Sequence, residues 1–142
     1  MKGERVFSKP AAVVDSMTEA DCRMFLACQT FGRVGMTNGG LPVILPVRYF
    51  YVYNAITFRA GEGTKLRAAA SGDVLAFEVD AYDPELDDGW SVLVLGRATV
   101  LTTEHEFEEL PTLDAALTGD ACNRYVRLQC ELISGRRLGG AP

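Results

Sequence analysis

Short β-rich segments joined by turns of glycine and asparagine are the feature that most limits how this chain can fold. Residues 31–37 and 41–51 are rich in β-forming side chains and flank Asn38-Gly39-Gly40, which tolerates the positive φ of a tight hairpin turn. A parallel sheet would need a long helix between its strands, and no such segment is present. The sequence therefore predicts a mainly β fold, a six-stranded antiparallel barrel with short helices. The four remaining strands are predicted over residues 55–59, 73–82, 90–102 and 126–132.

The predicted helices are few and brief. Thr18 has the residue type and position of an N-cap, and apolar residues then recur at helical spacing to about Cys28. A chain of 142 residues fits one domain, in which we expect residues 1–15 to form an N-terminal arm and residues 138–142 a flexible tail. Further short helical segments are predicted over residues 65–70, 103–110 and 112–117.

Composition argues against several classes of partner. The net charge of −5 and the isoelectric point near 4.9 would repel a nucleic acid over most of the surface. No apolar run approaches the ~20 residues of a membrane span, and the N-terminus lacks the apolar core of a signal peptide. The four cysteines form no C-x-x-C pair, and His105 is the only histidine, so no metal site is expected. We therefore expect a cytoplasmic protein that binds neither nucleic acid nor membrane.

Positive charge is concentrated in one part of this acidic chain. Residues 31–70 hold five basic side chains and one acidic one, whereas residues 71–131 hold fourteen acids and three arginines. Such a segment could direct a positive potential toward a small anionic ligand. The alternative is that these bases are separate surface residues, each paired with an acid elsewhere in the fold. The five basic residues are Arg33, Arg48, Arg59, Lys65 and Arg67.

The end of the third predicted strand has the composition of a phosphate site. Gly61 and Gly63 allow backbone N–H groups to approach an anion, Thr64 offers a hydroxyl and Lys65 a full positive charge. The dinucleotide fingerprint would need glycine where Leu66 stands, and the Walker motif needs lysine before threonine. The segment therefore predicts a phosphate-binding turn of another kind, with an ordinary surface turn as the alternative.

The strand that begins near Trp90 is apolar on both faces. Alternation along this strand places Trp90, Val92 and Val94 on one face and Leu93 and Leu95 on the other. An apolar outer face of a barrel is usually shielded from water by another element or another chain. A second copy of the chain or the helix that begins after Thr18 could provide it, and the alternation alone leaves both possibilities open.

Together these segments resemble the flavin-binding split-barrel superfamily, in the branch related to pyridoxamine 5'-phosphate oxidase. The similarity spans roughly residues 18–137 and depends on the order and spacing of its parts. It implies a Greek-key-like split barrel that forms a homodimer, with two symmetric FMN sites at the interface. The parts are Phe31-Gly32-Arg33-Val34, Leu41-Pro42-Val43-x-x-Pro46-Val47, Phe58-x-x-Gly61-x-Gly63-Thr64-Lys65-Leu66, Val79-Asp80, Trp90-Ser91-Val92-x-Val94-x-Gly96-Arg97-Ala98 and Ile133-Ser134-Gly135-Arg136-Arg137.

The resemblance also implies which residues hold the cofactor. Residues 45–48 would lie along the flavin, Phe58 and Arg59 beside the ribityl phosphate, and Thr64 and Lys65 around that phosphate. Ser91 would reach the isoalloxazine ring. Phe58 could instead belong to the core, and Arg59 could pair with Glu62 or Asp80. The implied cofactor-binding residues are Leu45, Pro46, Val47, Arg48, Phe58, Arg59, Thr64, Lys65 and Ser91.

A family resemblance of this kind implies an FMN-binding oxidoreductase, a reductase of a small organic acceptor. The flavin itself performs hydride transfer, so no catalytic residue is assigned. One alternative is a reductase that uses the deazaflavin coenzyme F-420 on the same fold, whose anionic tail would suit the basic residues. Another is a non-catalytic flavin-binding protein.

Overall fold

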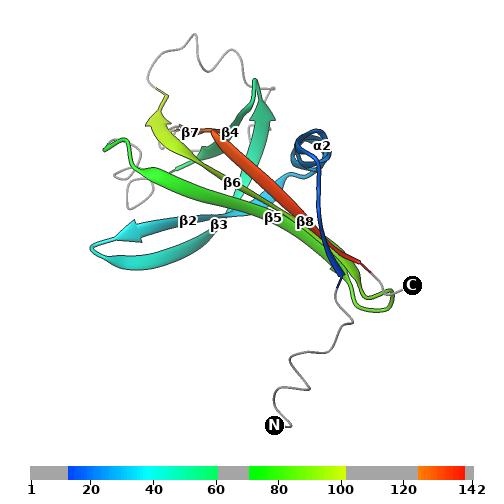
Figure 1. The fold of residues 1–142 in the computed structure, drawn as a ribbon. Coiled ribbons are helices and arrows are strands. Elements are labelled where there is room, and N and C mark those ends of the chain that lie inside the picture. The colour runs from blue at the N-terminus through cyan, green and yellow to red at the C-terminus, as the bar shows by residue number, and fades with distance from the viewer. Residues whose placement is uncertain (1–12, 61–70, 102–124, 140–142) are drawn as a thin grey trace.

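A computed structural model describes residues 13–60, 71–101 and 125–139 of the chain (Figure 1). Within these ranges lie eight strands and one helix. In chain order they are β1 (Val13–Ser16), α2 (Glu19–Cys28), β2 (Phe31–Asn38), β3 (Leu41–Val52), β4 (Ala55–Arg59), β5 (Val74–Asp83), β6 (Asp88–Val100), β7 (Tyr125–Gln129) and β8 (Leu132–Gly139).

Six of these strands close into a barrel. The sheet order is β1-β8-β6-β5-β2-β3-β4-β7, and β7 also pairs with β6, so β2 to β7 form a continuous antiparallel ring. Strand β6 makes this possible because its first half pairs with β8 and its last residues pair with β7. The prediction of a mainly β fold with a six-stranded antiparallel barrel is confirmed. Strands β8 and β1 extend the sheet beyond the ring along β6.

Two tight turns set the register of the β2-β3-β4 meander. Gly39 and Gly40 connect β2 to β3 with φ values of 59° and 83°. Tyr53 and Asn54 connect β3 to β4 with φ values of 52° and 57°. Positive φ at both central residues gives the strand twist that a two-residue hairpin needs. The first of these turns was predicted from the sequence, and it is confirmed.

The prediction for the last strand was wrong. Residues 126–132 were expected as one strand, but β7 ends at Gln129 and the chain bends at Glu131 before β8 begins. Between them, the N–H of Cys130 donates to the carbonyl of Asn54 at 3.2 Å. Alternation continues across the bend, since buried Cys130 is followed two residues later by the apolar Leu132, and so the pattern conceals the break. Strand β8 then continues to residue 139 and pairs with β1, with Val13 opposite Gly139. The end of the expected arm and the start of the expected tail are thus paired with each other.

Helix α2 begins as predicted. The Thr18 hydroxyl accepts a hydrogen bond from the Asp21 N–H at 3.1 Å, which satisfies a free donor of the first turn. The helix is held to the sheet by the Tyr49 hydroxyl, which donates to the Leu26 carbonyl at 2.7 Å. The Phe25 ring also stacks on Trp90, with ring centroids 4.1 Å apart. The other helices, predicted over residues 65–70, 103–110 and 112–117, lie outside the described residues.

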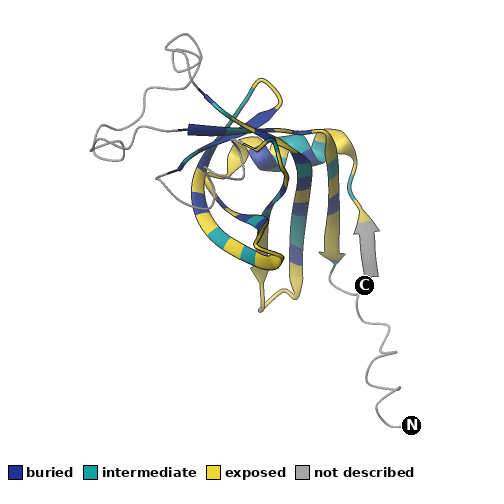
Figure 2. Ribbon diagram, turned by 90° about the vertical axis from the view of Figure 1, so that its left-hand side faces the viewer, coloured by how far each residue is buried: buried dark blue, intermediate teal, exposed yellow. Residues whose placement is uncertain are grey.

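Side chains on the barrel strands alternate between a buried inner face and an outer face (Figure 2). On β5, for example, Leu75, Phe77 and Val79 are buried, and the residues between them are not. The Phe77 ring meets Tyr49 edge-on across the barrel interior, with centroids 4.7 Å apart. Strand β4 departs from this pattern because both of its faces are covered from Ala55 to Phe58. The core therefore fills the barrel and continues under α2.

The only helix in the described ranges is ten residues long, too short to cross a membrane. Those ranges also contain no group of three metal-binding side chains, and their three cysteines are unpaired.

Candidate functional site

The outer face of the sheet carries a row of side chains that crosses four strands. Arg33 on β2 is opposite Glu78 on β5, Glu78 is opposite Leu93 on β6, and Leu93 is opposite Ser134 on β8. Directly opposed residues of antiparallel strands have Cβ atoms about 5 Å apart, so their side chains interact. A chain of charged, apolar and hydroxyl groups therefore runs across the outer face.

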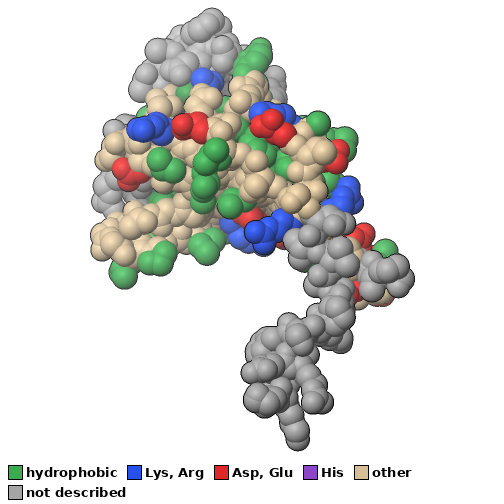
Figure 3. Space-filling view, viewed as in Figure 1, with side chains coloured by type: hydrophobic (Ala, Val, Ile, Leu, Met, Phe, Trp, Pro, Cys, Tyr) green, Lys and Arg blue, Asp and Glu red, His purple; other side chains and the backbone are tan. Residues whose placement is uncertain are grey.

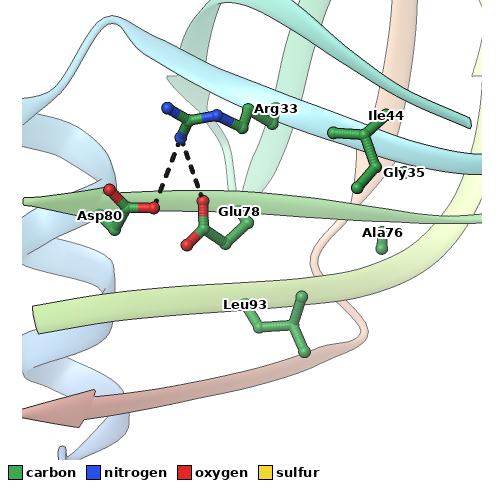
Figure 4. A pocket seen from close by; sticks show the side chains of 7 residues that line it. All are labelled: Arg33, Gly35, Ile44, Ala76, Glu78, Asp80 and Leu93. Carbon is green, nitrogen blue, oxygen red and sulfur yellow. Dashed lines mark hydrogen bonds and ion pairs between the residues drawn. The ribbon is translucent and has the colours of Figure 1, made fainter.

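A hollow of about 370 Å³ lies beside this row (Figure 4). Its apolar floor combines the small residues Gly35 and Ala76 with Ile44 and Leu93. Figure 4 shows three charged side chains along one side, where Arg33 from β2 lies above two carboxylates from β5. The volume falls in the range of small-molecule sites, and an apolar floor with a few polar groups is their usual composition. The charged residues are Arg33, Glu78 and Asp80.

One guanidinium joins the two carboxylates. Arg33 Nη1 lies 3.4 Å from Glu78 Oε1 and 3.4 Å from Asp80 Oδ2. Partial burial raises the pKa of Glu78 to about 7, and the neighbouring Asp80 adds to this effect while Arg33 opposes it. The sequence left open that each basic residue of segment 31–70 pairs with an acid elsewhere in the fold. For Arg33 this alternative is correct. Glu78 changes charge in the neutral range.

A second hollow of about 250 Å³ adjoins the first. Glu78 and Leu93 line both, so the two form one groove across β2, β5, β6 and β8. The second hollow is the more polar, since two serines and an arginine line it. These polar residues are Ser91, Ser134 and Arg136.

Comparison with known proteins identifies the family. A family model described as pyridoxamine 5'-phosphate oxidase matches residues 18–137. The chain belongs to the pyridoxamine 5'-phosphate oxidase family. An uncharacterised protein of Mycobacterium tuberculosis, Rv0080, is 28% identical over 139 residues, which cover 94% of this chain and 91% of that protein.

Solved structures of the same fold include proteins described as binding FAD. The FAD binding protein of Mycobacterium smegmatis is 28% identical, with a TM-score of 0.66 over 89% of this chain and 99% of its own. A FAD-binding protein of Mesorhizobium loti has a TM-score of 0.74 over 89% of this chain and 99% of its own. At 19% identity, the second likeness shows the fold alone. Both agree with the split barrel that the family resemblance implied.

Three of the residues expected to hold the family's cofactor share the outer face. Ser91 lines the second hollow, and Pro46 is opposite Arg33 on the neighbouring strand. Arg48 follows two residues later on β3, with an exposed side chain opposite Phe31. The sheet thus brings a cationic group, a hydroxyl and both hollows to one surface.

The remaining expected residues lie elsewhere. Leu45 and Val47 point inward, and Phe58 is fully buried in the core, which was the alternative considered for it. Because these side chains point into the core, these three residues could contact a cofactor on the outer face only through their main-chain atoms. Arg59 lies at the end of β4, opposite Tyr125. Thr64 and Lys65 lie outside the described residues and stay predictions.

The outer face is not covered by α2. The helix packs on Trp90, whose side chain points to the opposite side of β6 from Leu93. Leu93 is 39% exposed in the single chain. Of the two covers considered for this strand, the chain's own helix is therefore excluded.

Sequence reasoning missed Glu78 and Arg136 as site residues. Glu78 was counted only as part of an acidic segment, although it stands between buried Phe77 and Val79 and so points outward. Arg136 was noted only within a family motif. Strand register is what brings these residues to one groove, and a single strand's pattern does not contain register.

Replacing Glu78 with glutamine should make the chain more stable in alkaline solution. The pKa of this carboxyl rises from 4.5 to about 7 on folding, so the folded chain retains a proton there that the unfolded chain releases. The stability of the wild-type chain should therefore fall as the pH rises from 4.5 to about 7, and the whole loss should be present above pH 7. We expect the free energy of unfolding of Glu78→Gln, relative to that of the wild type, to be about 1 kcal/mol higher at pH 8 than at pH 5. This value is reduced for solvent screening because the side chain is one-third exposed.

Urea unfolding at both pH values measures this difference. Glu85→Gln, at an exposed residue of the β5-β6 turn, is the control and should keep the wild-type pH dependence. An unchanged pH dependence in Glu78→Gln would show that this carboxyl ionises as in the unfolded chain.

Proposed function

We propose that this chain binds a flavin on the outer face of the barrel, between two copies of itself, and reduces a small organic acceptor. The observation that carries the proposal is the groove of two adjoining hollows, because a Ser91 hydroxyl and an apolar floor of small residues meet there. The FAD binding protein of Mycobacterium smegmatis, which has the same fold at 28% identity, supports a flavin as the ligand.

The residues of the first hollow fit a flat ring. Gly35 and Ala76 are opposite each other on neighbouring strands, and neither has atoms beyond Cβ. A ring can therefore lie close to the sheet, with Leu93 against its edge. Polar side chains at one end of the hollow can meet the heteroatoms of the ring, as binding sites for cofactors usually require.

A second copy of the chain is the proposed cover of this face. An apolar row crosses the sheet from Ile44 through Gly35, Ala76 and Leu95 to Leu132. The two ends of the row are 71% and 65% exposed, which is unusual for such large apolar side chains. Figure 3 shows hydrophobic side chains over the β2-β3 hairpin and in the middle of the visible face. Association of two such faces removes this area from water.

When bound, a flavin supplies hydride chemistry, and the chain's own residues supply position and charge. Arg48 offers a cation on the outer face for a phosphate group. Glu78 can hold or release a proton at neutral pH beside the hollow. FMN is the form that we propose. FAD and the deazaflavin coenzyme F-420 are alternatives that the ligand's mass distinguishes.

The test begins with the absorption spectrum of the freshly purified chain and the mass of the small molecule released on denaturation. Binding of FMN, FAD and F-420 to ligand-free protein then follows by fluorescence titration. Ala76→Phe, which fills the floor of the first hollow, should weaken flavin binding at least about tenfold. Val74→Phe, two residues away on the same face but outside the hollow, is the control and should bind flavin normally.

A wild-type chain that binds none of the three at micromolar concentration would overturn the proposal. Equal flavin binding by Ala76→Phe and the wild type would show that the flavin does not bind in this hollow. Turnover with a reduced nicotinamide donor across a panel of acceptors separates an enzyme from a flavin carrier. Binding without any turnover would leave the carrier as the function.

A further inference from the structure

The second hollow contains hydrogen-bond donors from two adjacent strands. Ser91 on β6 is directly opposite Arg136 on β8, and Leu93 is opposite Ser134 in the next outward-facing pair. All four residues line the hollow. Two hydroxyl groups and a guanidinium group therefore line the same hollow, with an apolar side chain beside them.

Arg136 has no acidic partner within the described part of the chain. Arg33 on the same face is bound to two carboxylates. Arg137, the next residue along, points to the other face and lies over the Phe25 ring at 5.7 Å. Asp80 is opposite Ser91 from the other side, but its carboxylate pairs with Arg33. The charge of Arg136 is thus available to a ligand.

We infer that this second hollow binds the carboxylate of a small organic anion whose apolar body lies over Leu93, at the boundary with the first hollow. A guanidinium group matches the planar geometry of a carboxylate and can donate two hydrogen bonds to it. The hydroxyls of Ser91 and Ser134 can donate to the same group. The apolar side chain of Leu93 beside them suits an aromatic or aliphatic body.

This inference makes the acceptor an organic acid rather than a neutral compound. Ser91 is also the residue expected to reach the flavin ring, so a ligand held by Arg136 would lie beside that ring. In this respect the identification of the anion as the acceptor rests on the proposed function. The binding of the carboxylate does not, because every residue involved belongs to the described single chain.

Glu78 makes the binding depend on pH. Glu78 lines both hollows and faces Arg33 on β2, Asp80 on β5 and uncharged Leu93 on β6, and it shares the second hollow with Arg136 on β8. A neutral Glu78 tolerates an anion beside it, whereas an ionised one repels it. Since the pKa of this group is raised to about 7, anion binding should weaken as pH rises through neutrality.

Benzoate is a suitable probe because it combines a flat apolar ring with one carboxylate. Its binding to the full-length, flavin-free chain is measured by NMR titration, together with benzyl alcohol, which has the ring without the charge, and acetate, which has the charge without the ring. We expect benzoate to bind more tightly than either. Arg136→Gln should weaken benzoate binding at least about tenfold.

The matched control is Arg97→Gln, which removes an exposed arginine from the same face outside both hollows. It should bind benzoate as the wild type does. Glu78→Gln should bind with an affinity that no longer falls between pH 6 and pH 8, roughly the range over which a group of pKa about 7 titrates.

Equal benzoate binding by Arg136→Gln and wild type, an equal loss in Arg97→Gln, or no saturable binding at millimolar benzoate would overturn the inference. Unfolding curves of both variants confirm that they are folded. If flavin binds and benzoate does not, only this inference fails. If benzoate binds and no flavin does, the anion site stands and the proposed function fails.

Discussion

Replacing Gly96 with alanine should destabilise the chain by about 3 kcal/mol or more, among the larger effects of adding one methyl group. A Cβ atom at this position would collide with the carbonyl group of Gln129, whose carbon would be only 2.9 Å away. Gln129 is the last residue of β7, and its backbone cannot retreat without opening the pairing between β6 and β7. Because this pairing closes the barrel, the strain acts on the whole ring. Urea unfolding at constant pH measures the loss.

Gly35→Ala is the matched control for this substitution. Gly35 is also a strand glycine, but a Cβ there meets only Ala76 Cβ at 3.5 Å, which is an ordinary contact. This variant should lose little stability, less than about 1 kcal/mol. Similar losses in the two variants would mean that glycine matters here only through strand propensity, and not through the approach of β7.

Replacing Ile44 with aspartate should abolish self-association of the chain. Ile44 is 71% exposed in the single chain, so the substitution costs little folding energy in a monomer. In the proposed dimer the same side chain lies against a second copy, and a carboxylate there would be buried without a partner. The expected loss is at least about 2 kcal/mol of association energy, or more than tenfold in dissociation constant. Sedimentation velocity at several concentrations measures it.

Leu86→Asp is the control, since Leu86 is 68% exposed in the turn between β5 and β6 and lies outside the apolar row. This variant should associate as the wild type does. A wild-type chain that stays monomeric at all concentrations, or an Ile44→Asp chain that still dimerises, would refute an interface on this face. A dimer that persists in Ile44→Asp but no longer binds flavin would mean that Ile44 serves the ligand and not the association.

Local chemistry was enough to predict most of the barrel. Tight turns such as Gly39-Gly40 need positive φ, and very few residues supply it, so the sequence around them is specific. The end of the chain was harder because Cys130 and Leu132 continue an alternating pattern across a bend. The bend follows the point where β7 passes close to Gly96, a contact between residues more than thirty positions apart, which no local pattern can encode.

The candidate site was predictable only in part for the same reason. Ser91 and Arg48 were expected from the family resemblance, and both lie on the outer face. Phe58 was expected at the cofactor as well, but it is buried in the core. Both faces of its strand are covered, so the strand has no alternation of buried and exposed residues that would show which way Phe58 points. The pairing of Arg33 with Glu78 and Asp80 joins residues forty-five and forty-seven positions apart. Such a pair follows from how strands are ordered in the sheet.

The pairing of β1 with β8 has a practical consequence for engineering this chain. Val13 is opposite Gly139, so the chain enters and leaves its described structure at one edge of the sheet. A short peptide could join these two positions. New termini could be introduced at the exposed Gly39-Gly40 turn, because no other part of the chain lies within 4 Å of where a Cβ atom of either glycine would be. A circularly permuted version would keep every strand pairing while turning the tip of the β2-β3 hairpin into two free ends.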